Sequence, residues 1–294
     1  MAAQQRITAR DQMLGMAFAS PWLIGFTVFL LLPIGMSLYY SFTLYDMNTP
    51  PVWIGPDNFR RLLGDAVFYR AVFNTLIYAA CSVPLTLGGS LLLAVLLNRP
   101  VPGQGFFRTA VFLPTLTPAV AAAMIWLVML NGKRGVVNQW LAAMHVAGPA
   151  WLEDPKWIMA TLVVLSLWGI GNAVVIFLAG LQDIPVELYE AAQIDGATGV
   201  SRFWHITVPM LSPVIFYNMI MGIIASWQIF TLPRILVDQK GDRAGYFYSN
   251  YIVDAAFKEQ RFGDASAMAW ILFLILMGLT LAVVLAGRRW VHTR

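Results

Sequence analysis

The stretch YEAAQIDGATGVSRFWHITVP, residues 189–209, lies between two long apolar segments at approximately residues 158–181 and 210–232. A membrane-spanning helix needs roughly 20 mostly apolar residues, and both segments meet that length. The stretch between them carries charged residues, a glycine and a proline, with alanines where a surface helix usually carries charge. The sequence here predicts two spans joined by a connector that has a structure of its own.

The composition of the whole chain agrees with a membrane protein. Of its 294 residues, 59% are apolar and 12% are charged, whereas a soluble domain has about 25% charged residues. The formal net charge of +4 does not indicate a nucleic-acid-binding protein, because the basic residues are scattered and form no patch. The single cysteine, Cys81, has no partner for an internal disulfide, and no Cys/His cluster predicts a metal site.

Six segments are long and apolar enough to span a bilayer, and every Asp, Glu, Lys and Arg lies outside them. We therefore expect an all-α integral membrane protein whose single domain covers residues 1–294. The spans are expected at approximately 17–40, 72–97, 109–130, 158–181, 210–232 and 267–286. The positive-inside rule barely favours an orientation. If the N-terminus is cytoplasmic, the C-terminus with Arg288 and Arg289 is cytoplasmic too, and the loop 182–209 is a net-acidic cytoplasmic loop.

Helix-breaking residues recur inside the expected spans. Two interpretations stay open: ordinary kinks with close helix packing, or a cavity-lining bundle that changes shape. The residues are Pro33, Pro84 with Gly88 and Gly89, Pro114 with Pro118, Gly169 with Gly171, and Pro213.

Two loops on the other side of the membrane also carry signals. Residues 58–76 space apolar residues at helical intervals with arginines between them, which predicts an amphipathic helix at the interface before the second span. The loop 233–266 has as many basic as acidic residues and is polar enough to face water and a soluble partner.

The loop 182–209 is predicted to form two short helices around a turn. Pro185 suits the first turn of a helix and Glu187 suits its N-terminal dipole. Gly196 is expected to end this helix, and Thr198 or Ser201 to cap the next one. Because Ala191 and Ala192 leave the first helix bare, another surface can approach it closely. A docking element on the cytoplasmic face is the expected result.

The pattern Glu190-Ala191-Ala192, Gly196, Ile206 and Pro209 resembles the EAA motif of ATP-binding-cassette importer permeases. The longer segment PVELYEAAQIDGATGVSRFWHITVPMLSP resembles the carbohydrate-uptake permeases of the maltose and glycerol-phosphate type. NFRRLLGDAVFYRAVFNTL, FFRTAVFLPTLTPAVAAAMIW and AAFKEQRFGDASAMAWILFLIL also resemble segments of that family, so the likeness covers most of the chain. The chain departs from it after the fifth span, where VDQKGDRAG replaces the family's Thr-x-Gly-Gly-Pro turn.

The resemblance implies a fold, a role and a set of partners. The fold would be the six-helix core of a type I, MetI-like importer permease in a bacterial or archaeal plasma membrane. In this family the motif forms a coupling helix seated in a groove of a cytoplasmic ATPase. The chain would be non-catalytic and hold no cofactor, since ATP and Mg would be bound by the ATPase subunits. Its partners would be a homologous second permease, two ATPase copies, an extracytoplasmic solute-binding protein, membrane lipid and a sugar-type substrate. The residues expected to couple to the ATPase are Glu190, Ala191, Ala192, Asp195, Gly196, Ile206 and Pro209.

A sugar site needs polar groups that match hydroxyls and aromatic faces that contact sugar rings. Trp168 and Asn172 are four residues apart, which places them on one face of a helix. The family places such sites near mid-membrane on the spans flanking the motif, although one permease of the pair can hold the whole site. Alternatively, these residues make helix–helix hydrogen bonds or anchor the interface. The candidates are Tyr78, Trp168, Gly169, Asn172, Asn218, Ser226, Trp227 and Gln228.

Two rival functions are weighed against this one. An ion-coupled secondary carrier would be expected to carry an ionisable relay within its spans, and these six spans contain no Asp, Glu, Lys or Arg. A membrane-embedded glycosyl or lipid enzyme would need an acidic pair or a nucleophile–base pair, and none has convincing spacing. The chain also has no G-x-x-x-x-G-K-[ST] phosphate loop. A transporter with these features is expected to take its energy from a separate ATPase.

Overall fold

The computed structural model describes residues 9–100, 102–237, 244–288 and 290, so Arg289 and residues 238–243 of the loop 233–266 lie outside it. The described chain is almost entirely helical, with one two-stranded antiparallel hairpin. Its contacts separate two compact units, residues 1–64 with 254–271 and residues 65–253 with 272–294. The expected single domain over residues 1–294 stays a prediction.

The first unit begins with a long apolar helical segment. Its elements are α1 (Ala9–Phe26), the π-helix η1 (Thr27–Leu31), α2 (Leu32–Ser41), β1 (Thr43–Leu44), β2 (Val52–Trp53), α3 (Asp57–Leu63), the π-helix η5 (Asp254–Lys258) and the start of α16 (Phe262–Gly287). Residues 13–41 are apolar enough to span a membrane, and the most apolar part of this segment buries none of its residues within the chain. Such a helix needs lipid or another subunit around it.

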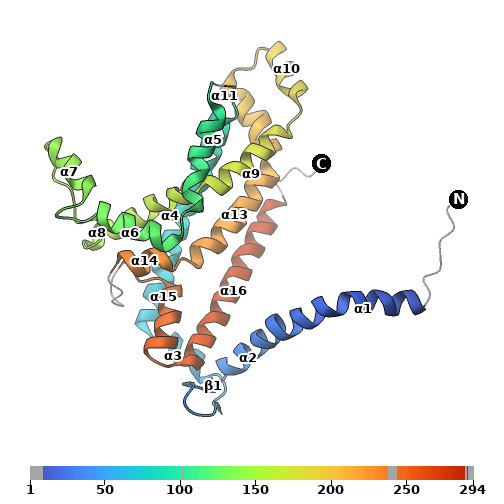
Figure 1. Cartoon of the computed structure of the whole chain (residues 1–294), viewed down its shortest axis with the longest axis vertical. Helices are drawn as coiled ribbons and strands as arrows, with labels where there is room; N and C mark the ends of the chain where they lie inside the picture. The colour runs from blue at the N-terminus through green and yellow to red at the C-terminus, as the bar shows by residue number, and fades with distance from the viewer. Residues whose placement is uncertain (1–8, 101, 238–243, 289, 291–294) are drawn as a thin grey trace. The chain divides into compact units, whose positions relative to one another are not determined.

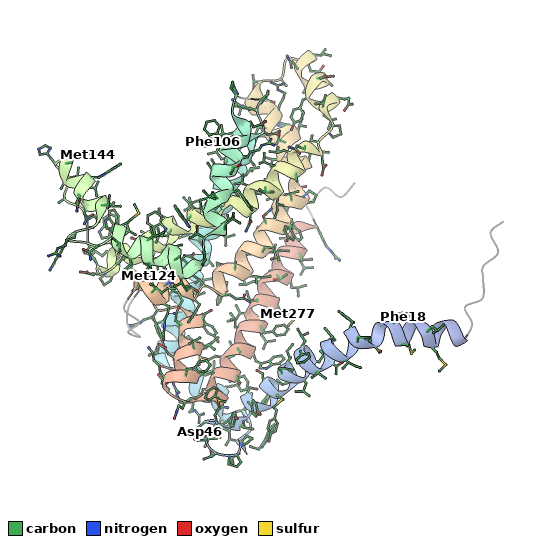
Figure 2. All side chains as sticks on the ribbon, in the orientation of Figure 1. Phe18, Asp46, Phe106, Met124, Met144 and Met277 are labelled. Carbon is green, nitrogen blue, oxygen red and sulfur yellow. The ribbon has the colours of Figure 1, made fainter. Side chains whose placement is uncertain are left out.

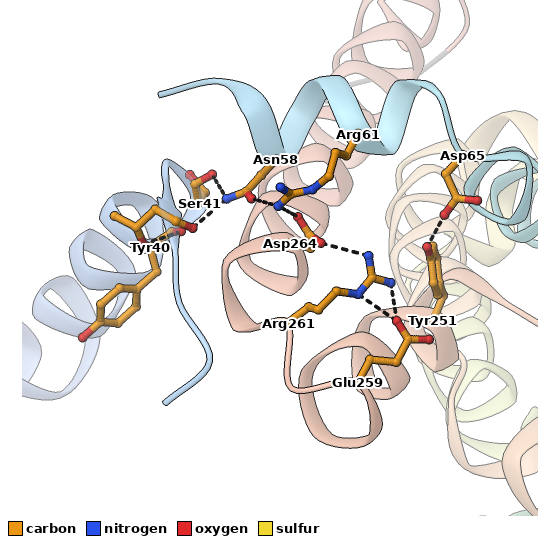
Figure 3. A network of polar contacts seen from close by, with 10 residues as sticks. Tyr40, Ser41, Asn58, Arg61, Asp65, Tyr251, Glu259, Arg261 and Asp264 are labelled. Atoms are coloured by element: carbon orange, nitrogen blue, oxygen red, sulfur yellow. Dashed lines mark hydrogen bonds and ion pairs between the residues drawn. The ribbon is translucent and has the colours of Figure 1, made fainter. Parts of the chain in front are cut away.

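A buried carboxylate organises the polar end of this unit (Figure 3). Asp264 at the start of α16 is 1% exposed, and it accepts hydrogen bonds from Arg61 Nη2 at 2.7 Å and Arg261 Nη1 at 2.9 Å. Arg61 also donates to Asn58, whose amide donates to the main-chain oxygens of Ser41 and Thr43. The network ties α2, α3 and α16 together.

We expect Asp264→Asn to lower the free energy of unfolding by about 1.5 kcal/mol, because it weakens two charge-assisted hydrogen bonds to half-exposed arginines. Thermal unfolding of the detergent-solubilised protein measures the loss. Asp57→Asn is the matched control, since Asp57 pairs with Arg60 at the surface and such pairs contribute about 0–1 kcal/mol. Equal losses in the two variants would contradict the structural role of Asp264.

The second unit holds the remaining helices (Figure 1). They are α4 (Ala66–Leu97), α5 (Gln104–Phe112), the 3-10 helix η2 (Leu113–Leu116), α6 (Ala119–Met129), α7 (Val136–Ala143), α8 (Pro155–Leu165), the 3-10 helix η3 (Ser166–Gly169), α9 (Gly171–Gln182), α10 (Val186–Ile194), α11 (Gly199–Arg202), the π-helix η4 (Phe203–Thr207), α12 (Val208–Met210), α13 (Ser212–Trp227), α14 (Thr231–Leu236), α15 (Tyr248–Val253) and the rest of α16. The long helix α4 packs against both α9 and α13.

Four helical segments of the described chain are long and apolar enough to cross a membrane, and two bent helix pairs bring the number to six. These four segments are residues 13–41, 66–97, 212–236 and 262–287. The expected spans 109–130 and 158–181 are the bent pairs. The first bends by 97° between η2 and α6, and the second by 51° between η3 and α9.

Proline and glycine explain where the bends occur. Pro118, with ψ 137°, is the extended N-cap of α6, so the helix before it ends. A Cβ added to Gly171 at the start of α9 would lie 2.6 Å from the Val111 oxygen, so Gly171 allows close helix packing. A Cβ added to Gly169 would meet nothing within 4 Å. Pro84 does not interrupt α4.

The expected interfacial helix over residues 58–76 is wrong. Helix α3 ends at Leu63 with Gly64 as its C-cap, and α4 starts at Ala66. The Asp65 side chain accepts a hydrogen bond from the Val67 N–H at 2.8 Å and so caps the new helix. The apolar residues do recur at helical spacing, but Gly64 ends one helix and Asp65 caps the next, so the segment forms parts of two helices. Cys81, the single cysteine, is exposed on α4.

Candidate functional site

The connector 182–209 forms the predicted pair of short helices. Its first helix, α10, ends in a Schellman motif, in which Ala197 N–H donates to Ala192 O at 2.8 Å and Gly196 N–H to Gln193 O at 3.1 Å. Gly196 has φ +76°, a left-handed conformation that suits glycine. The Thr198 hydroxyl accepts from the Ser201 N–H and caps α11. The predicted turn at Gly196 and cap at Thr198 are confirmed.

The inner face of the connector is attached to the helical core. Ile184 before α10 and Leu211 after α12 are buried in a cluster formed by α4 and α9. Tyr189 and Ile206 pack against the same cluster. The Tyr189 and Thr207 hydroxyls share a hydrogen bond of 2.9 Å that joins α10 to η4. The connector is therefore packed against the spans on both sides of it.

The outer face of the connector is exposed and unpaired. No hydrogen bond or ion pair of the Glu187, Glu190 or Asp195 carboxylate occurs within the described residues, so these acids do not cap the local helices. Beside them, Ile194 is 87% and Val200 71% exposed. Acids and large apolar side chains on one bare surface are typical of a face that a partner covers.

The structure divides the seven predicted coupling residues between these two faces. Glu190, Ala191, Asp195 and Gly196 are exposed, whereas Ala192, Ile206 and Pro209 are half-buried.

A second feature is a cavity of about 610 Å³ between α4, α6, α9 and α13. Six of the eight predicted substrate-path residues line it, namely Tyr78, Trp168, Gly169, Asn172, Asn218 and Ser226. The amides of Asn172 and Asn218 differ in their bonding. Asn218 donates to the Val214 oxygen at 2.9 Å. The Asn172 amide has no hydrogen-bond partner within the described residues and is exposed to the cavity.

The reason given for pairing Trp168 with Asn172 is wrong, although the structure brings both residues to one cavity. Trp168 lies in η3 and Asn172 in α9, and the chain bends by 51° between them. The other two predicted residues lie elsewhere: Trp227 is buried, Gln228 is exposed at the end of α13, and neither lines the cavity.

Sequence reasoning missed a row of hydroxyl groups on α4. Ser82, Thr86 and Ser90 line the cavity with Tyr78, and the four are spaced by four residues, which places them on one helix face. The hydroxyls of Thr86 and Ser90 donate back to main-chain oxygens one turn earlier, at 2.8 and 2.6 Å. Their oxygen atoms keep lone pairs that can accept further hydrogen bonds. The spacing of four was the signal that could have found them.

The outside of this unit is apolar. Phe106 on α5, Met124 on α6 and Met144, the C-cap residue of α7, project outward (Figure 2) and are more than half exposed. A bundle with polar groups around its cavity and apolar groups outside is suited to lipid surroundings. With the connector, this arrangement can guide a polar solute across a membrane, and no catalytic group is evident in the cavity lining.

Comparisons with known proteins agree with this geometry. Residues 86–291 match the family model described as "Binding-protein-dependent transport system inner membrane component". The chain is 38% identical to the probable ABC transporter permease protein YesP of Bacillus subtilis (strain 168), over 98% of this chain and 95% of YesP. It is 33% identical to the lactose transport system permease protein LacF of Rhizobium radiobacter, over 93% of this chain and 94% of LacF.

A solved structure supports the fold as well. In the crystal structure of a bacterial alginate ABC transporter in complex with its alginate pentasaccharide-bound periplasmic protein, one chain matches with a TM-score of 0.82 and 26% identity. The match covers 95% of each chain. The predicted all-α, MetI-like permease fold and the non-catalytic role are confirmed. The chain belongs to the family of binding-protein-dependent transport system inner membrane components.

Proposed function

We propose that this chain is the permease subunit of an ATP-driven, binding-protein-dependent importer for a sugar or sugar derivative. Its relatives include a lactose permease and an alginate transporter. The structure of the connector 182–209 is the observation that supports a coupling role. Its inner face is fixed to the spans, while its outer face offers unpaired carboxylates and exposed apolar side chains.

The importer would contain a homologous second permease, two ATPase subunits that bind ATP and Mg, and an extracytoplasmic solute-binding protein. Glu190 and Asp195 would meet basic groups of an ATPase, and Ala191 and Ala192 would allow its close approach. In this arrangement the connector and both termini would lie in the cytoplasm, and the chain would lie in the plasma or inner membrane. The loop 233–266 would then lie on the side of the binding protein.

The cavity would be the part of the sugar path that this chain provides. Amide and hydroxyl groups can pair with sugar hydroxyls, and Trp168, which is 38% exposed, can offer an aromatic face to a sugar ring. ATP binding would close the ATPases around the connectors of both permeases, and the spans would move with them to open the cavity outward.

Reconstitution tests this function. Proteoliposomes containing the co-purified subunits and the binding protein are expected to take up sugar only when ATP is present inside. Uptake driven by an ion gradient without ATP would support the secondary carrier instead. Purification of a functional chain without any ATPase would also count against the proposal.

Asn172→Leu tests the sugar path. Losing one hydrogen bond to the sugar is expected to reduce uptake about tenfold, since such bonds contribute about 1–1.5 kcal/mol. Initial uptake rates of labelled sugar measure the effect. Gln228→Leu is the matched control, because Gln228 lies outside the cavity, and it should transport normally. Normal uptake by the Asn172 variant would remove Asn172 from the path.

A further inference from the structure

A separate groove of about 250 Å³ lies between α4, α5 and α9, away from the lining of the sugar cavity. Arg108 on α5 and Gln182 at the end of α9 are its polar lining residues, and the rest of its wall is apolar or glycine. Arg108 reaches the Leu97 oxygen at the end of α4. The polar groups therefore lie where α4 and α9 end, and the apolar wall continues along α9 toward Gly171.

Arg108 is poorly paired for a guanidinium beside an apolar wall. Its Nη2 donates to the Leu97 oxygen at 3.3 Å, which is a long contact. Its Nε is buried without a partner, and no carboxylate pairs with it within the described ranges. A guanidinium has five N–H donors and always carries its charge. The remaining N–H donors of Arg108 and its uncompensated charge favour the binding of an anion.

We propose that this groove binds an anionic phospholipid, whose phosphate accepts hydrogen bonds from Arg108 and Gln182 and whose acyl chain lies along the apolar wall. Arg108 directly precedes the apolar segment 109–130, and Gln182 directly follows the segment 158–181. Both residues thus lie at headgroup depth, in the leaflet on the side of the connector.

The groove matches a lipid better than a free anion. Phosphate alone would satisfy the guanidinium but would leave the apolar wall uncovered. A phospholipid supplies a phosphate group for the polar end of the groove and an acyl chain for the apolar wall. Asp183 follows Gln182 directly but does not line the groove. The bound lipid would hold together the ends of α4, α5 and α9, next to the start of the connector.

Thermal unfolding of the full-length chain tests the site, using the protein purified in mild detergent with its co-purifying subunits. Adding phosphatidylglycerol is expected to raise the midpoint by about 3 °C more than adding phosphatidylcholine, because a ligand that binds only the folded state stabilises it. Inorganic phosphate is the second probe and should give no shift.

Arg108→Gln is expected to abolish the extra shift with phosphatidylglycerol, whereas Arg99→Gln, at an exposed arginine outside the groove, should keep it. If Arg108→Gln does not fold, Ala179→Phe replaces it, because this change fills the groove and leaves Arg108 in place. An undiminished shift in a folded groove variant, no extra shift with phosphatidylglycerol in the unchanged protein, or an equal shift with inorganic phosphate would overturn the proposal.

Discussion

Glu190→Arg is expected to reduce ATP-dependent uptake by about tenfold or more while the protein still folds and inserts. A like charge placed against a complementary surface costs several kcal/mol, and 1.4 kcal/mol corresponds to about tenfold in an equilibrium constant. Folding should be unaffected, because Glu190 is exposed and has no side-chain partner within the described residues. Uptake and ATP hydrolysis are measured together in proteoliposomes. Hydrolysis without uptake is the expected signature.

Glu153→Arg is the control for this experiment. Glu153 is an equally exposed acid, but it lies just before α8, at the opposite end of the helix pair that leads to the connector. It should leave uptake unchanged. If both variants transport normally, the connector does not act through Glu190. If both fail, a general effect of added charge explains the loss.

Gly171→Ala is expected to lower the free energy of unfolding by about 3 kcal/mol, at the upper end of what overpacking costs. The added Cβ would lie 2.6 Å from the Val111 oxygen and 3.0 Å from the Phe112 Cα, and both are main-chain atoms that a rotamer change cannot move. Helices α5 and α9 would have to move apart where they meet at Gly171. The unfolding midpoint of the solubilised protein measures the loss.

Gly169→Ala is the matched control, only two residues away. Its Cβ would meet nothing within 4 Å, and alanine is favoured over glycine in helices by about 0.5–1 kcal/mol. This variant should be at least as stable as the unchanged protein. Equal destabilisation of both variants would show that glycine flexibility, not close packing, is what the bend requires.

The sequence predicted the number of spans because charge exclusion from the bilayer acts on each segment separately. It also predicted the local structure of the connector, since the φ of Gly196 and the cap at Thr198 depend on near neighbours. It did not predict the bends, because a proline such as Pro84 stays within α4 while Pro118 ends a helix. Which outcome occurs is decided by packing between helices distant in sequence.

The cavity lining was predicted only in part, because it too depends on how helices distant in sequence pack. Asn172 and Asn218, which line the cavity, stand out in the sequence because polar residues are rare in spans. Trp227 does not line the cavity, because adjacent residues point in different directions on a helix. The row Ser82, Thr86 and Ser90 was overlooked because small hydroxyl residues are compatible with a span and do not interrupt an apolar segment. The depth at which each hydroxyl lies depends on α4 being continuous.

The unbroken length of α4 has a mechanical consequence. Its 32 residues extend for about 48 Å, well beyond a hydrocarbon core about 30 Å thick. A rod of that length, tilted by about 10° about one end, sweeps its other end through about 8 Å. Because α4 packs on both α9 and α13, which flank the connector, a small rotation at the connector end of α4 becomes a large displacement at its other end. The hydroxyl row on α4 would travel with the rod, so the cavity can change width without any side chain changing its rotamer.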